Sequence, residues 1–192
     1  MKDHLLLLTQ FLRSPRTIAS VTPSSKALVT ALLKEAKVSE ADSVVEIGTG
    51  TGVMTEQIYK SLPKGGAFLA VERNSKLAAA TRRKCPDVEV VQTDAVKLPM
   101  LLAIRDIGGC DSIASGVPWS TLLPREQDDL LEAIHDSLNE GGRFATFVYL
   151  HGLGLPSFWN FQRKLKHKFN RTGRSKLIWG NIPPAVVLWG EK

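Results

Sequence analysis

The fold is decided by the stretch Ser43-Val44-Val45-Glu46-Ile47-Gly48-Thr49-Gly50-Thr51-Gly52. Its first residues are apolar and β-branched, which predicts a buried parallel strand. Glycines at alternate positions let the backbone turn sharply and leave the main chain open to a ligand. Apolar residues at helical spacing follow over residues 53–62. A strand, a glycine turn and a helix in this order predict a nucleotide-like ligand at the carboxyl end of the strand. A tight turn without a ligand is the alternative.

A second apolar segment, residues 67–71, ends on Glu72. An acidic residue that closes the second strand, about 20 residues after the glycines, is placed to accept hydrogen bonds from both ribose hydroxyls. The glycine spacing differs, however, from the G-x-G-x-x-G pattern of dinucleotide-binding proteins. The sequence therefore predicts a ribose-containing ligand other than a dinucleotide.

With Glu46 in front of the glycines, the stretch resembles motif I of the class I S-adenosylmethionine (SAM) methyltransferases, acidic-x-G-x-G-x-G. The resemblance implies an α/β, Rossmann-like fold whose seven-stranded sheet is mostly parallel, with an antiparallel last strand and helices on both faces. It also implies SAM as the cofactor, with no metal and no covalent intermediate. The residues assigned to SAM binding are Glu46, Gly48, Thr49, Gly50, Gly52, Glu72, Arg73, Asp94, Ala95 and Ser115.

Two later strands bring further residues to the same edge of the sheet. A strand over residues 88–91 is followed by Asp94 and Ala95. The resemblance implies that Asp94 accepts from the adenine amine of SAM, and a turn-capping role is the alternative. A fourth strand, residues 111–115, leads into Ser-Gly-Val-Pro at residues 115–118, where DNA and RNA adenine methyltransferases carry Asn/Asp-x-Pro-Tyr or Phe.

Four segments narrow the resemblance to the bacterial phospholipid N-methyltransferases, which methylate phosphatidylethanolamine. They are Arg-Ser-Pro-Arg at 13–16, Pro-Ser-Ser at 23–25, Ser-Gly-Val-Pro at 115–118 and Asn-Ile-Pro-Pro-Ala at 181–185. In such an enzyme Pro-Ser-Ser would lie over the SAM site. Arg13 and Arg16 would meet a lipid phosphate, or else they are solvated surface groups. The resemblance covers essentially the whole chain.

Three residues are candidates for the reaction itself. Trp119 is expected either to stack on a cationic head group or to belong to the core. Tyr149 matches a tyrosine of the phospholipid family and lies, with His151, at the carboxyl end of the fifth predicted strand, residues 143–149. His151 is of the type that accepts an amine proton at neutral pH, although a lone histidine is more often a surface group.

Composition restricts the class of partner. The 192 residues, 43% hydrophobic and 23% charged, fit one globular domain, and the net charge of +6 indicates an anionic partner, either nucleic acid or a membrane surface. No run of about 20 apolar residues is present. Cys85 and Cys110 lack metal spacing and are expected to be packing residues in a reducing cytoplasm.

The chain divides into a helical lid or membrane-facing segment, residues 1–36, and a catalytic core, residues 37–192, with a basic insertion at 151–176. A helix over residues 4–12 is apolar on one side and packs on the domain or lies on lipid. Residues 156–176 alternate aromatic and basic side chains, which fits an anionic membrane, RNA or an ordinary solvated helix. The pattern also predicts a helix from Pro124 to Leu138 that Glu140-Gly141-Gly142 ends, and two last strands on either side of 181–184.

Taken together, the sequence predicts SAM-dependent N-methylation of an amino-headed phospholipid such as phosphatidylethanolamine. The enzyme would work peripherally on an anionic membrane, at its cytoplasmic inner face. One alternative is an rRNA adenine N-methyltransferase, against which the missing Asn/Asp-x-Pro-Tyr loop argues. The other is a SAM-binding protein without catalysis.

Overall fold

The computed structural model describes residues 24–192. The helix predicted over residues 4–12 lies outside the described residues, as do Arg13 and Arg16. Of the predicted lid, residues 1–36, only the part from residue 24 onward is described. Within residues 24–192, no helix has the length and apolar character needed to cross a bilayer.

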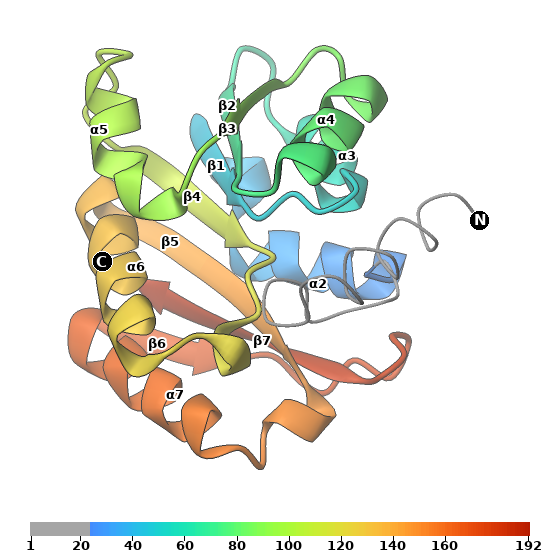
Figure 1. Ribbon diagram of the computed structural model, residues 1–192, viewed down its shortest axis with the longest axis vertical. Coiled ribbons are helices and arrows are strands. Elements are labelled where there is room, and N and C mark those ends of the chain that lie inside the picture. The colour runs from blue at the N-terminus through green and yellow to red at the C-terminus, as the bar shows by residue number, and fades with distance from the viewer. Residues whose placement is uncertain (1–23) are drawn as a thin grey trace.

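The centre of the molecule is a seven-stranded sheet, which confirms the predicted fold class (Figure 1). The spatial order is β3-β2-β1-β4-β5-β7-β6, and only β7 runs against the other strands. The strands are β1 (Ser43–Ile47), β2 (Ala67–Glu72), β3 (Glu89–Gln92), β4 (Cys110–Ser115), β5 (Leu138–Tyr149), β6 (Arg171–Arg174) and β7 (Ala185–Glu191). The strand order reverses between β1 and β4, which is where ligands bind in open α/β sheets.

Helices cover both faces of the sheet, as predicted (Figure 1). Side chains of α2 (Lys26–Glu35) and α3 (Val53–Ser61) pack with Val44 on one face, and α4 (Ser75–Lys84) packs on Ala70 and Val90 of neighbouring strands. The other face carries α5 (Leu98–Ala103), α6 (Pro124–Ser137) and α7 (Pro156–Lys168), which pack with Val45 and Ile47. Successive residues of a strand point to opposite faces, so the short apolar run of β1 supplies both cores.

The fifth strand begins earlier than predicted. Helix α6 ends at Ser137, and β5 runs from Leu138 straight through Glu140-Gly141-Gly142, which therefore does not end the helix. The pairing of β5 with β4 shifts between Cys110 and Ser112, so the glycine pair lies at an irregularity within the strand. The Lys192 ammonium donates to the carbonyls of His135 and Leu138, a tertiary contact that satisfies the end of the helix.

The sixth strand lies at Arg171–Arg174, whereas the sequence predicted it directly before Asn181. Gly173 makes this position possible, because a Cβ there would lie 2.5 Å from the Trp189 ring of β7. Residues 175–184 instead form a loop that touches the sheet through the pair Ile178 and Ala185. The basic segment thus contributes an edge strand, where charged side chains are well tolerated.

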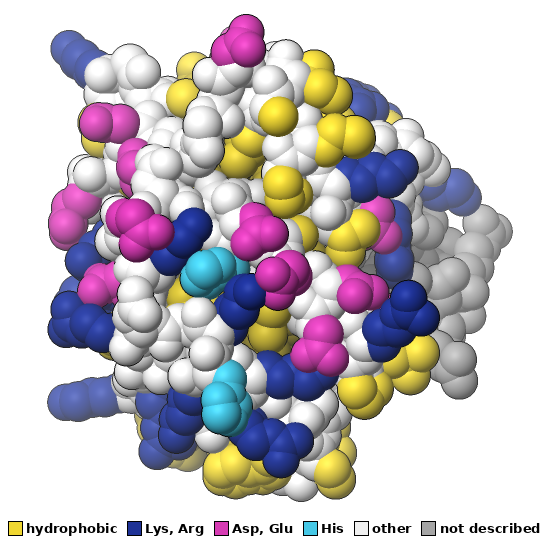
Figure 2. Space-filling model, turned by 90° about the vertical axis from the view of Figure 1, so that its left-hand side faces the viewer, with side chains coloured by type: hydrophobic (Ala, Val, Ile, Leu, Met, Phe, Trp, Pro, Cys, Tyr) yellow, Lys and Arg dark blue, Asp and Glu magenta, His cyan; other side chains and the backbone are white. Residues whose placement is uncertain are grey.

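The predicted basic helix is present as α7, but its apolar side is buried. Phe158, Phe161 and Leu165 pack in the core. Two of its cations pair with α6, Lys164 with Asp128 at 2.7 Å and Lys168 with Glu132 at 2.5 Å. Acidic and basic side chains mingle on this side of the molecule, and basic ones gather towards its lower edge (Figure 2). Most of the apolar side of α7 is therefore used by the core, and Trp159 is its one large hydrophobic side chain that stays exposed, at 59%.

Two loops meet closely at the carboxyl edge of the sheet. The Gly116 N–H donates to the Ile47 carbonyl at 2.8 Å, and the Gly48 N–H donates to the Val71 carbonyl at 2.8 Å. A Cβ on Gly116 would lie 2.5 Å from the Gly48 oxygen, so only glycine permits this approach. The loops after β1 and β4 are thereby held side by side at the point where the strand order reverses.

Candidate active site

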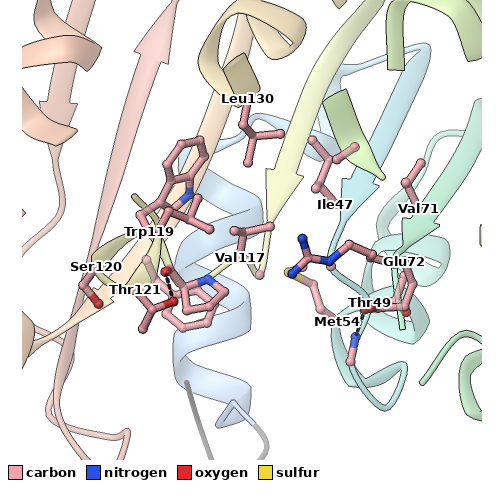
Figure 3. Close-up of a pocket in the computed structure, with 18 of the residues that line it drawn as sticks. Ile47, Thr49, Met54, Val71, Glu72, Val117, Trp119, Ser120, Thr121 and Leu130 are labelled. Carbon is pink, nitrogen blue, oxygen red and sulfur yellow. Dashed lines mark hydrogen bonds between the residues drawn. The ribbon is translucent and has the colours of Figure 1, made fainter. Parts of the chain in front are cut away.

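A cavity of about 690 Å³ opens at the carboxyl ends of the central strands. One part is lined by the loops after β1, β2 and β3, and the other by the segments after β4 and β5 together with α6. Figure 3 shows the two groups: Thr49 and Glu72 on one side, Trp119 and Thr121 on the other, with Val117 between them. Most of the predicted site residues line this cavity, namely Gly48, Thr49, Gly50, Glu72, Arg73, Asp94, Ala95, Trp119, Tyr149 and His151.

The glycine loop is shaped by two different requirements. All three glycines have positive φ, of 79°, 57° and 78° at Gly48, Gly50 and Gly52, which glycine adopts without strain. Nothing lies within 4 Å of a Cβ placed on Gly50, so this part of the backbone is open. A Cβ on Gly52 would instead lie 3.2 Å from the Thr81 side chain, and Gly52 does not line the cavity. Gly52 is thus needed for packing against α4, whereas Gly50 leaves room for a ligand.

Helix α4 packs against the glycine loop after β1 and holds it in place. The Thr81 hydroxyl lies 2.9 Å from that of Thr49 and 3.2 Å from the Gly50 carbonyl. The buried Cys85 thiol points at the Gly52 carbonyl at 3.8 Å. The sequence does not predict these contacts of Thr81, because Thr81 meets the loop only when α4 packs against it.

Glu72 presents a carboxylate to the cavity that is already oriented by the backbone. It accepts from the Gly50 N–H at 3.1 Å and from the Asn74 N–H at 2.8 Å. Burial raises the pKa of Glu72, and these two N–H groups and the nearby Arg73 charge partly offset that increase. Each carboxylate oxygen retains acceptor capacity, so Glu72 can still accept from ribose hydroxyls.

Asp94 caps a turn, which was the alternative role, and its position leaves the predicted contact with the cofactor open to it. Its carboxylate accepts from the Val96 N–H at 3.2 Å and so caps the short turn at Ala95–Lys97. The same side chain lines the cavity, and its second oxygen lies 3.8 Å from the Arg73 guanidinium. The cap fixes the direction of the carboxylate, which remains half-exposed and able to accept from a ligand amine.

Two further residues assigned to the cofactor do not line the cavity. The Ser115 hydroxyl accepts from the Val117 N–H at 3.2 Å and so shapes the loop after β4. Glu46 is completely buried beneath the loop, and neither its carboxyl oxygens nor the Thr55 hydroxyl has a hydrogen-bond partner within residues 24–192. Complete burial raises the pKa of Glu46 to about 8; the neighbouring Thr55 opposes this shift and the charge of Glu72 adds to it.

The three reaction candidates lie together in the second part of the cavity. Trp119 is buried, with its ring stacked on Phe161 at 4.3 Å and edge-on to Phe144 at 5.7 Å. One face of the indole is therefore occupied by protein, although Trp119 still lines the cavity. The rings of Tyr149 and His151 are stacked at 5.7 Å and 13°, with Tyr149 buried and His151 exposed.

Two lining residues were not predicted from the sequence: Glu126 and Asp129 reach the cavity from α6. Ser24 also lines the cavity, and it belongs to the Pro-Ser-Ser segment that was expected over the SAM site. Acidic residues are common on the solvent-facing side of any helix, so the sequence does not distinguish Glu126 and Asp129 from other surface residues. Only the tertiary structure shows that they line the cavity.

The arrangement fits SAM. The open backbone at Gly50 and the carboxylates of Glu72 and Asp94 line the first part of the cavity. The second part begins at Val117 and Trp119, where an acceptor for the methyl group would lie. Bound SAM supplies a methyl group on a positively charged sulfur, and the surrounding carboxylates favour that charge.

Comparisons with known proteins agree with this geometry. A family model described as ribosomal RNA adenine dimethylase matches residues 10–130. An ornithine lipid N-methyltransferase of Singulisphaera acidiphila is 30% identical over 190 residues, which cover 96% of this chain and 94% of that one. A ribosomal RNA small subunit methyltransferase A of Chlorobaculum tepidum is 33% identical over 93 residues, 48% of this chain and 32% of that one.

Solved structures show the same fold at low sequence identity. An O-methyltransferase from Bacillus cereus in complex with SAH superposes with a TM-score of 0.70 at 15% identity, covering 100% of this chain and 91% of that one. The O-methyltransferase TomG from Streptomyces achromogenes, in complex with SAM, gives 0.66 at 14% identity, covering 100% and 90%. The chain is therefore a class I SAM-dependent methyltransferase. Within that class it belongs to the family that the ribosomal RNA adenine dimethylase model describes.

Replacing Glu72 tests the cofactor site. In Glu72→Gln, one end of the side chain becomes a donor and faces a backbone N–H of Gly50 or Asn74, so the ribose acceptor is lost. We expect the affinity for SAH to fall about tenfold to a hundredfold, the range for hydrogen bonds to a charged group. Isothermal calorimetry with SAH measures this. Glu89→Gln, at the far end of β3, is the control; equal affinity of both variants would contradict the assignment.

Because Glu46 is buried, we expect the free energy of unfolding to depend on pH. Between its ordinary pKa of 4.5 and the raised value of about 8, the folded protein binds a proton that the unfolded chain has released. The free energy of unfolding contributed by Glu46 therefore falls as the pH rises through this window, by up to about 1.4 kcal/mol per pH unit. In Glu46→Gln this contribution disappears, so the variant gains stability relative to the parent as the pH rises to 8.

Urea unfolding at several pH values between 5 and 8.5 measures the difference between parent and variant. The exposed carboxyl of Glu40 provides the control, since Glu40→Gln removes a surface charge only. A parent-minus-variant difference that stays constant across this range would show that Glu46 is ionised in the folded protein.

Proposed function

We propose that the protein transfers a methyl group from SAM to the amine of an aminolipid head group. The observation that carries the proposal is the loop after β4. Ser115-Gly116-Val117-Pro118 offers no amide or carboxylate side chain to hold and activate an adenine amine. An aliphatic amine is a good nucleophile once deprotonated, so it needs placement more than activation.

The second part of the cavity suits such a substrate. Apolar side chains of Leu122, Leu130 and Leu155 line it and are compatible with the lipid portion next to the head group. Glu126 and Asp129 add negative charge on the same side, which favours approach of an ammonium group. The similarity to an ornithine lipid N-methyltransferase along the whole chain supports a lipid amine as well.

The proposed reaction is a direct displacement. The amine nitrogen forms a bond to the methyl carbon, the carbon–sulfur bond breaks with its electron pair passing to sulfur, and the nitrogen loses a proton. Trp119 and Tyr149 border the position of the amine and fix its direction. His151, stacked on Tyr149 and exposed to solvent, is the proposed route for the proton.

Phosphatidylethanolamine and ornithine lipid present the same chemistry, a primary aliphatic amine on an amphiphile. The sequence motifs favour the first, and the relative with full-length similarity acts on the second by its name. We place the reaction at an anionic, cytoplasmic membrane face, because residues 141–190 contain no acidic residue and eight Lys or Arg.

An rRNA adenine N-methyltransferase is the second candidate, because the family model and a Chlorobaculum tepidum rRNA enzyme match the chain. That enzyme matches 48% of this chain and the chain spans 32% of its length, so the similarity covers less than half of either protein. The loop after β4 departs from the adenine-methylating pattern at the point where the substrate binds.

Methyl-labelled SAM distinguishes the candidates. The protein is incubated with detergent micelles of phosphatidylethanolamine, with micelles of ornithine lipid, and with small-subunit rRNA. We expect label in at least one lipid and none in the RNA. Label in RNA alone would establish the second candidate, and SAH binding without transfer to any of the three would indicate a SAM-binding protein without catalysis.

Asp129 tests the path of the amine into the cavity. Its carboxylate is exposed and only loosely paired with Arg125, at 3.8 Å. Removing an exposed charge of this kind changes an interaction by up to about 1 kcal/mol, so Asp129→Asn should raise the KM for the lipid amine up to about fivefold. The kcat and the affinity for SAH should not change. Asp128→Asn, one residue away but outside the cavity, is the control, and an equal rise in KM there would point to a general surface effect.

A further inference from the structure

The loop between β6 and β7, residues 175–184, carries the two most exposed large hydrophobic side chains of the described residues. Trp179 is 72% exposed and Ile182 is 83% exposed. Patches of exposed apolar side chains often mark sites of interaction with other proteins or with membranes. Between them Asn181 is only 3% exposed. The loop therefore presents two apolar side chains on either side of a buried polar anchor.

Asn181 fixes the loop to the body of the protein. Its side-chain oxygen accepts from the Ser25 N–H at 2.8 Å, and its amide nitrogen donates to the Pro183 carbonyl at 2.7 Å. The Leu150 N–H donates to the Pro184 carbonyl at 2.7 Å. The exposed side chains are thus displayed from a hydrogen-bonded base, and their exposure is a stable property of this surface.

Both anchors belong to segments that line the cavity. Ser24, next to Ser25, and Tyr149, next to Leu150, are lining residues. Tyr149 also pairs with Ala185, which directly follows the loop. The loop lies beside the start of α2, whereas α5 lies at the opposite corner of the molecule (Figure 1). The loop that carries the two exposed hydrophobic side chains is therefore attached to segments that form the cavity wall.

The charge around the loop fits an anionic surface. Arg174 and Lys176 lead into it and are exposed, and neither has an acidic partner within the described part of the chain. Lys26, also exposed, opens α2, whose next residue, Ala27, packs against Gly180 of the loop. Apolar side chains surrounded by cations are typical of segments that enter the head-group region of anionic bilayers.

We propose that Trp179 and Ile182 insert into an anionic phospholipid bilayer and hold the cavity entrance at the lipid surface. The inference rests on the proposed function, because it assumes a lipid substrate. Helix α7 offers less for insertion than this loop, because its apolar side is buried in the core except for Trp159, which is 59% exposed. Tryptophan is well suited to the insertion, since its ring is apolar and its N–H is satisfied at the interface.

Vesicle co-sedimentation tests the proposal, with vesicles of phosphatidylglycerol and phosphatidylethanolamine. We expect Trp179→Ser and Ile182→Ser each to weaken binding roughly tenfold, as loss of one inserted apolar side chain implies. Ile104→Ser is the matched control: it makes the same change at a residue that is 69% exposed, and it follows α5 on the side where Arg105 pairs with Glu89, the first residue of β3. Unchanged binding of both loop variants, or an equal loss in the control, would overturn the proposal.

The same variants separate this proposal from the proposed function. Methyl transfer to lipid dispersed in detergent micelles should be retained in Trp179→Ser and Ile182→Ser, because neither residue lines the cavity. Loss of vesicle binding with retained micelle activity is the expected combination. If the parent protein methylates no lipid in micelles, the proposed function fails, whatever the vesicle result.

A fluorescent label locates the loop directly. The native cysteines, Cys85 and Cys110, are buried, so Ile182→Cys provides a single accessible thiol among the described residues for a polarity-sensitive dye. We expect a blue shift on addition of anionic vesicles and none with a dye at Ile104→Cys. No shift with vesicles would overturn the proposal, as would a shift that depends on protein concentration alone, which would indicate a second copy of the chain as the occupant.

Discussion

The site depends on the close approach of two backbone loops at the carboxyl ends of β1 and β4. The Gly116 N–H donates to the Ile47 carbonyl, and a side chain on Gly116 would collide with the Gly48 oxygen. This contact joins the glycine loop after β1 to the loop after β4, and both loops line the cavity. Because parallel strands end at the same edge of a sheet, the reversal of strand order between β1 and β4 creates the space that the two loops border.

The buried carboxyl groups beneath the glycine loop lower the stability of the folded protein. Glu72 is buried but accepts two backbone N–H bonds, whereas Glu46 is buried with no partner among residues 24–192. A buried, unpaired carboxyl is unfavourable for folding and retains a proton near neutral pH. Departures of this kind from good packing are expected at functional sites. Here Glu72 presents its carboxylate to the cavity, whereas Glu46 stays buried beneath the loop and outside the cavity lining.

Two segments have roles in the tertiary structure that differ from those expected from the sequence. Helix α7 is basic and amphipathic, which suggests a surface helix, yet Phe161 and Leu165 pack in the core and Lys164 pairs with Asp128. The loop between β6 and β7, by contrast, was predicted in part as a strand, but it holds Trp179 and Ile182 exposed to water. The basic side chains of α7 and the exposed apolar side chains of the loop between β6 and β7 are together suited to an amphiphilic substrate.

The sequence by itself determined the central strands, the glycine loop, the carboxylate that closes β2 and the class of enzyme, because each depends on residues that are neighbours along the chain. It placed β6 and the start of β5 wrongly, since these depend on Gly173 fitting against Trp189 and on an irregular pairing between β4 and β5. Only the tertiary structure showed that Thr81 supports the loop, that Glu126 and Asp129 line the cavity, and that Asn181 holds Ser25 from 156 positions away. Contacts over such separations leave no local pattern, because the packing of helices on the sheet decides which distant residues meet.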